Sequence, residues 1–200
     1  MELRRQIVHF LFGLIIVLLI YFNIINYQIV GIFFLLSLFL NYFCKIKFIN
    51  NFFKFFERES ETKTFRAKGM VFYLLGTFLC LIFFEKNVAM ASITILAVGD
   101  SLSTLKFNIK HPFNERKYLE ASILAWLVSG FVASYFVPFY VSYIASFIAM
   151  FVESFDLRKY KIDDNLIVPL IAGLVMSLIS LVWIIILIIK IIYTNLDEIF

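Results

Sequence analysis

Seven apolar runs of membrane-spanning length constrain this chain more than any other feature. A helix needs about 20 mostly apolar residues to cross a bilayer. The hydrophobic content of the 200 residues, 62%, also exceeds the roughly 45–50% typical of soluble domains. We therefore predict an all-α fold, a polytopic transmembrane helix bundle with about seven spans that forms one integral-membrane domain over residues 1–200. The predicted spans are residues 6–22, 29–43, 70–84, 88–105, 118–137, 139–155 and 166–193.

The basic residues are distributed unevenly among the connections between these runs. Sixteen of the 18 Lys and Arg lie before the first run or in the connections 45–68, 106–117 and 156–165. The alternate connections hold only Lys86. Cytoplasmic loops of membrane proteins are enriched in Lys and Arg. We therefore predict a multi-pass protein whose N-terminus and three basic connections face the cytoplasm.

The connection 45–68 has the pattern of an amphipathic helix. Phenylalanines at positions 48, 52, 55 and 56 recur at spacings of three and four, with basic residues around them. This pattern predicts a cytoplasmic helix that lies in the headgroup plane or, equally, one that packs onto the ends of the bundle.

Two further observations exclude other classes of site. Cys44 and Cys80 lie in or beside apolar runs, which favours packing roles over a disulfide or a metal site. No basic stripe alternates with aromatic residues in the manner of a nucleic-acid surface, so we expect no nucleic-acid partner.

Asp100 is the least expected residue in the apolar runs. It follows Gly99, at the end of an apolar stretch that begins at Val88. A carboxylate at membrane depth costs about 2.5–3.5 kcal/mol even on the mildest insertion scale, and such residues are functional candidates by default. The glycine lets a ligand or another helix approach closely. The alternative is a carboxylate that has reached the interface at a helix end, and Asp100 alone does not separate the two.

Other charged residues fall at the same predicted face. Acidic residues contribute little to orientation, so the excess of basic residues does not explain the carboxylates there. Neighbouring carboxylates repel one another unless a cation joins them, and Mg²⁺ suits one or two carboxylates together with substrate phosphates. We therefore predict a cytoplasmic active site for Mg²⁺ and a nucleotide, reached sideways by a lipid. The polar residues at this face are Arg5, His9, Asp100, Lys117, Glu120, Glu153, Asp163, Asp164 and Asn165.

Several of these residues have a structural alternative. His9 is compatible with a histidine at a helix interface. One of Asp163 and Asp164 is expected to cap the last helix, a role that Asp favours. Glu120 falls in the first turn of a helix, where the helix dipole favours an acid. Glu153 lies near a helix C-terminus, where its charge opposes the dipole, so a structural role explains it least.

The ordered motifs of the chain resemble those of a known family. They are Glu2-x-x-Arg5-x-x-x-His9, Gly69-x-x-x-Tyr73, Gly99-Asp100, Lys117-x-x-Glu120-x-Ser122 and Asp163-Asp164-Asn165-x-x-x-Pro169. In this order, and over nearly the whole chain, the set resembles the dolichol/phytol/CTP-type diacylglycerol kinase family. These are polytopic membrane enzymes related to phosphatidate cytidylyltransferases. The resemblance implies transfer of the γ-phosphoryl group of CTP to the hydroxyl of a membrane lipid alcohol, with Mg²⁺.

The leading prediction is a CTP-dependent kinase of a long isoprenoid alcohol such as a dolichol or another polyprenol. Phosphoryl transfer depends mainly on positioning and charge neutralisation. The predicted metal ligands are Asp100, Asp163, Asp164 and Glu153; the predicted nucleotide contacts are Arg5, Gly99, Lys117 and Asn165; the predicted catalytic groups are His9, Asp100, Lys117, Glu120 and Asp164.

Three alternative functions remain open from the sequence. A cytidylyltransferase would make a CDP-activated lipid with the same CTP, Mg²⁺ and acidic residues, and a CTP-dependent diacylglycerol kinase would differ only in the acceptor. A small transporter or lipid-binding membrane protein is the non-enzymatic alternative. Transporter sites usually lie near the midplane. The middle of the predicted spans holds no polar residue stronger than Ser or Thr, such as Ser92, Thr94 and Ser129, which argues against ion-coupled transport.

Overall fold

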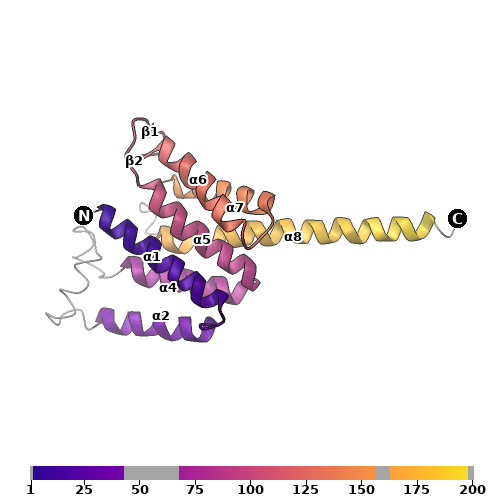
Figure 1. Cartoon of the computed structure of the whole chain (residues 1–200), viewed down its shortest axis with the longest axis horizontal. Coiled ribbons are helices and arrows are strands. Elements are labelled where there is room, and N and C mark those ends of the chain that lie inside the picture. Colours follow the sequence, from indigo (N-terminus) through magenta and orange to yellow (C-terminus); the bar gives the residue numbers. More distant parts are fainter. Residues whose placement is uncertain (1, 43–67, 156–162, 198–200) are drawn as a thin grey trace.

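The computed structural model describes residues 2–42, 68–155 and 163–197. In these ranges the chain is almost entirely helical, with one short hairpin (Figure 1). The elements are α1 (Glu2–Tyr21), α2 (Tyr27–Tyr42), α4 (Lys68–Phe83), α5 (Lys86–Ser103), β1 (Lys110–His111), β2 (Asn114–Tyr118), α6 (Leu119–Ala133), α7 (Phe139–Glu153) and α8 (Asp164–Asp197).

The all-α prediction is confirmed for the described residues, and each predicted span coincides with one helix. The break at Pro138 lies where it was predicted, since α7 begins at the next residue. Three boundaries were wrong by four residues. α1 begins at Glu2, before the predicted start of the first span. α6 ends at Ala133, because residues 134–136 already turn back onto it through main-chain hydrogen bonds. α8 runs on to Asp197, beyond the predicted end of the last span.

The connection between α5 and α6, predicted as a loop, contains an antiparallel hairpin. β1 and β2 pair across a tight turn at residues 112–113, with Lys110 opposite Tyr118. The Lys110 ammonium lies 4.4 Å from the centre of the Tyr118 ring, a cation–π contact that supports the pairing. The hairpin brings Lys117 to the start of α6.

α5 is the central helix of the bundle. Every residue from Val88 to Gly99 is buried, because α1, α4, α6, α7 and α8 all pack against this helix. The hydroxyls of Ser92 and Thr94 donate to the carbonyl oxygens four residues earlier, at 2.7 and 2.8 Å, so these polar groups are satisfied inside the core. α5 therefore delivers Asp100 to one end of a tightly packed bundle.

One close crossing ties α1, α4 and α5 together. Gly13 on α1 faces Ala97 on α5, and a Cβ at Gly13 would lie 2.5 Å from the hydroxyl oxygen of Tyr73 on α4. The Tyr73 ring is almost completely buried. The absence of a side chain at Gly13 is what lets the three helices meet one turn above His9.

The outer surface of the helices is strongly apolar. Large side chains such as Leu11 on α1, Phe33 on α2 and Phe147 on α7 are about half exposed. Among the described residues, one helix is both long enough and apolar enough by composition to cross a bilayer, over Asp164–Lys190 of α8. Its second half projects beyond the bundle (Figure 1), and every residue from Ser180 to Lys190 is exposed.

The helices alternate in direction, so the bundle has two distinct ends (Figure 1). One end holds the starts of α1, α4, α6 and α8, the ends of α5 and α7, and the hairpin; we call it the charged end. The other holds the turns at residues 22–26, 84–85 and 134–138; we call it the far end. The predicted amphipathic segment 45–68 and Cys44 lie outside the described residues, apart from Lys68, while Cys80 is buried as predicted.

Candidate functional site

A buried ion pair between Lys117 and Glu153 occupies the centre of the charged end. Lys117 is 7% exposed and Glu153 is 1% exposed. The Lys117 ammonium donates to Glu153 Oε1 and, at 2.9 Å, to the main-chain oxygen of the same residue. Ser103 Oγ also donates to Glu153 Oε1, at 2.6 Å. The pair thus joins β2 and α7 to the end of α5.

The second carboxylate oxygen of Glu153 is not used in the same way. Oε2 is buried and has no hydrogen-bond partner within the described part of the chain. A buried acceptor left unpaired costs roughly 1–3 kcal/mol. Such an atom is an unused hard oxygen ligand in the middle of the charged end.

The charges of the site act on one another across four elements. Burial opposes the charge of Lys117, but the carboxylates of Glu153, Asp164 and Asp100 together raise the pKa of this lysine above its usual value. These carboxylates therefore favour the charged form of Lys117. The carboxylate of Asp164 in turn interacts electrostatically with Lys117, Glu153, Asp100 and Asp163. The structure thus brings together acids that are far apart in the sequence.

Asp100 lies between this cluster and His9. The distance from His9 Nε2 to Asp100 Oδ2 is 3.6 Å, and both side chains are partly accessible, at 17% and 15% exposure. The His9 ring also packs edge-on against Tyr73, with 4.8 Å between ring centres. His9 therefore lies at a helix interface, which was the structural role considered for it. It is also paired with Asp100, a predicted metal ligand.

The two aspartates before α8 have different environments. Asp163 accepts a hydrogen bond from the Asn165 main-chain N–H at 3.2 Å, so it caps α8, and its other oxygen lies 3.8 Å from the Lys68 ammonium. Asp164, rather than Asp163, acts on Lys117. The Asn165 amide donates to the Gly69 carbonyl at 3.2 Å, which fixes α8 against α4. The prediction that one aspartate serves as a cap is confirmed, and Asp164 is the acid that belongs to the cluster.

Two predicted site residues have structural contacts that the sequence did not reveal. The Glu120 carboxylate accepts hydrogen bonds from the Ile109 N–H at 3.1 and 3.2 Å, and so holds the start of the hairpin onto α6. A Cβ at Gly99 would lie 2.6 Å from the sulfur of Met150, so this glycine makes room for α7. The side chain of Arg5 lies outside the described residues.

The oxygen ligands at the charged end suit a cation bound jointly by protein and substrate better than a cation enclosed by protein ligands alone. Among the described residues, no group of three or more His, Cys, Asp or Glu side chains is arranged to hold a metal ion. Mg²⁺ commonly takes only one or two protein carboxylates and completes its shell with water and phosphate oxygens. Asp100, Asp164 and the unpaired oxygen of Glu153 supply hard oxygens of that kind.

Comparison with protein-family models, with curated proteins and with solved structures finds no match to this chain. The family resemblance of the motifs therefore stays a prediction.

Proposed function

We propose that this protein is a multi-pass membrane enzyme that transfers the γ-phosphoryl group of CTP to the hydroxyl of an isoprenoid alcohol at the cytoplasmic face of the membrane. One observation carries the proposal. A buried Lys117–Glu153 pair, with Asp100 and Asp164 beside it, lies at one end of a bundle whose outer faces are apolar.

The membrane part of the proposal rests on the surface of the bundle. Soluble monomers rarely expose apolar patches larger than a few hundred Å², whereas α1, α2, α6 and α7 all point large apolar side chains outward. The helices of 15 to 20 residues are about 22–30 Å long, close to the ~30 Å core of a bilayer. The excess of Lys and Arg in the segments at the charged end favours the cytoplasm for that end.

The chemical part rests on a fixed cation among carboxylates. Phosphoryl transfer needs reactants held in line and negative charge neutralised. Lys117, oriented by two acceptors of Glu153, would bind phosphate oxygens. Asp100 and the unpaired oxygen of Glu153, together with phosphate oxygens, would hold Mg²⁺, which supplies further charge neutralisation when bound.

Asp164 is the best candidate to accept the proton of the lipid hydroxyl, because its carboxylate interacts electrostatically with Lys117 and Glu153 at the centre of the charged end. Glu120 is engaged with the Ile109 N–H. His9 lies on the other side of Asp100, against Tyr73. As the alcohol oxygen bonds to the γ-phosphorus, its proton passes to Asp164, the bond from that phosphorus to the β-phosphate oxygen breaks, and CDP leaves.

Labelled CTP tests the proposal. Purified protein in lipid nanodiscs is incubated with Mg²⁺, a polyprenol and CTP labelled in either the α- or the γ-phosphate. The γ-label should enter the lipid, and the α-label should not. Entry of the α-label instead would identify a cytidylyltransferase, and transfer only to diacylglycerol would identify a diacylglycerol kinase. No transfer to any acceptor would overturn the proposal.

A further inference from the structure

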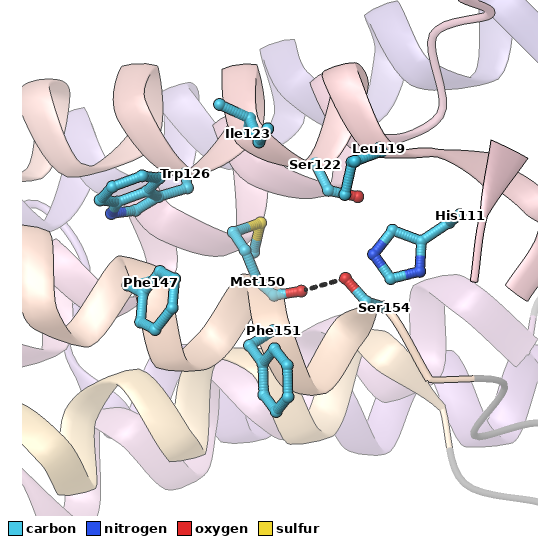
Figure 2. Close-up of a pocket in the computed structure, with 9 residues that line it drawn as sticks. All are labelled: His111, Leu119, Ser122, Ile123, Trp126, Phe147, Met150, Phe151 and Ser154. Atoms are coloured by element: carbon cyan, nitrogen blue, oxygen red, sulfur yellow. Dashed lines mark hydrogen bonds between the residues drawn. The ribbon is translucent and has the colours of Figure 1, made fainter. Parts of the chain in front are cut away.

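A cavity between α6 and α7 has a polar end and an apolar end (Figure 2). His111, Ser122 and Ser154 lie at one end, and Trp126 and Phe147 lie at the other. The remaining lining residues are Leu119, Ile123, Met150 and Phe151. Such a cavity matches an amphiphile with one small polar group and a hydrocarbon chain.

The polar end of the cavity adjoins the charged cluster. Ser154 directly follows Glu153 in the sequence, and His111 interacts electrostatically with Lys117. Met150, on the inner wall, is in close contact with Gly99, the residue before Asp100. A polar group bound at this end of the cavity would therefore be next to the Lys117–Glu153 pair.

The apolar part of the cavity opens toward the outside of the bundle. Ile123 on α6 is 45% exposed, and Phe147 and Phe151 on α7 are 51% and 48% exposed. The same side chains belong to the apolar outer surface of the helices. A chain lying in this cavity could thus enter from the side, without passing through the charged end.

The hydrogen-bonding groups at the polar end match an alcohol. Ser154 Oγ donates to the Met150 carbonyl at 2.8 Å (Figure 2), and Ser122 Oγ donates to the Tyr118 carbonyl at 3.3 Å. Both oxygens keep lone pairs free to accept. Nδ1 of His111 accepts from the Phe113 N–H at 3.3 Å, so a neutral His111 carries its proton on Nε2 and can donate. A hydroxyl, which both donates and accepts, satisfies this combination.

We propose that this cavity binds the lipid alcohol itself, with the hydroxyl at the His111–Ser154 end and the first part of its hydrocarbon chain along Trp126 and Phe147. The inference rests on the proposed function, because it assigns the acceptor of that reaction to a place. It adds a binding site and a hydroxyl-recognising group, His111, that the motifs did not indicate.

Binding can be measured without any nucleotide. Tritiated geranylgeraniol is titrated into purified protein in nanodiscs, comparing the unmodified chain with Ile123→Trp, which fills the cavity. The matched control is Ile144→Trp on α7, a residue that is also 45% exposed but does not line the cavity. We expect Ile123→Trp to weaken binding at least tenfold and Ile144→Trp to change it less than twofold. Equal affinity of the Ile123→Trp variant and the unmodified protein would overturn the proposal.

Photolabelling gives a second measurement that needs no variant. A geranylgeraniol analogue with a diazirine in its chain is irradiated with the unmodified protein, and labelled residues are identified by mass spectrometry. Labels on Trp126 or Phe147 support the site, and labels only on α2 or α8 overturn it. If the alcohol binds and labels the cavity but CTP transfers nothing to it, the proposed kinase activity fails while the binding site stands. If Ile123→Trp phosphorylates the alcohol with unchanged kcat and KM, the site fails while the activity stands.

Discussion

Each end of the bundle uses a lysine to join helices that are distant in the sequence, but the two lysines differ in every other respect. At the far end, Lys86 is exposed and donates to the Tyr21 carbonyl at 3.2 Å and to the Asn23 side chain at 2.6 Å. At the charged end, Lys117 is buried and pairs with a buried glutamate. Burying an ion pair rarely gains stability over apolar residues of the same size. Since the exposed arrangement is enough to join helices, the buried one calls for another explanation, and the proposed phosphate binding would provide it.

The largest effect should come from breaking the buried pair. Lys117→Met leaves the Glu153 charge without compensation, and removing one member of a buried pair costs about 3–5 kcal/mol. Lys86→Met at the far end should cost no more than about 1 kcal/mol, as expected for a surface contact. Unfolding of both variants in detergent, followed by circular dichroism, measures the difference. Equal losses of stability in the two variants would mean that the buried and the exposed lysine contribute equally to the fold.

A double variant separates stability from function at the same position. Lys117→Met combined with Glu153→Leu replaces the pair by apolar side chains and should recover most of the lost stability. Phosphoryl transfer from CTP should stay absent, because the fixed cation is gone. Recovery of activity together with stability would show that the pair has only a structural role.

Asp100→Asn should reduce phosphoryl transfer by at least about a hundredfold, a loss typical of removing one preorganised charged or polar group from an active site. The fold should persist, because the amide has the same shape and Asp100 is partly accessible. Glu85→Gln at the far end is the matched control and should keep its activity. The assay is γ-label transfer, with thermal unfolding to check the fold. Near-normal activity of Asp100→Asn would remove this residue from the site.

Helix packing offers a test with effects of opposite sign. Gly13→Ala places a methyl group against the Tyr73 hydroxyl and Ala97, and such overpacking costs about 1–3 kcal/mol. Gly130→Ala, toward the far end, meets its nearest atoms at 3.4 Å and should be tolerated or stabilise α6 slightly. Thermal unfolding of the two variants distinguishes them. An equal unfolding temperature for the two variants would contradict the close packing of α1, α4 and α5 at Gly13.

The smallest effect concerns pH. Burial and the charge of Lys117 lower the pKa of His111 below its ordinary 6.5. The unfolded chain therefore binds a proton near pH 6.5 that the folded chain takes up only at lower pH, so stability falls as the pH drops through that range. His111→Gln should flatten this part of the profile of Tm between pH 8 and pH 5. An unchanged slope in the variant would assign the pH dependence to other groups.

The helices could be predicted because the apolar runs are long and because charged residues or proline clearly separate one run from the next. Pro138 alone was enough to separate α6 from α7. The alternation of the runs was also enough to predict that Asp100, Lys117, Glu153 and Asp164 share one end. The direction and the length of the runs, which are properties of the chain itself, are sufficient for this prediction.

The pairing within the site could not be predicted, because it depends on which helices are neighbours. Lys117 and Glu153 are 36 residues apart, and no local pattern links them. The hairpin that Glu120 holds could not be predicted, because its residues 110–118 show no alternation of apolar and polar side chains. The close contact of Gly99 with Met150 could not be predicted either, because Met150 comes from a different helix.

The burial of α5 has a consequence for the biosynthesis of the protein, if the bundle crosses a membrane as proposed. α5 carries Ser92, Thr94 and Asp100, and other helices surround it from Val88 to Gly99. A nascent segment with this content gains little by partitioning into lipid alone. Its retention would depend on α6, α7 and α8, which are translated later. Ribosome-bound chains that stop soon after residue 105 should then release this segment from the translocon into water, whereas finished chains keep it.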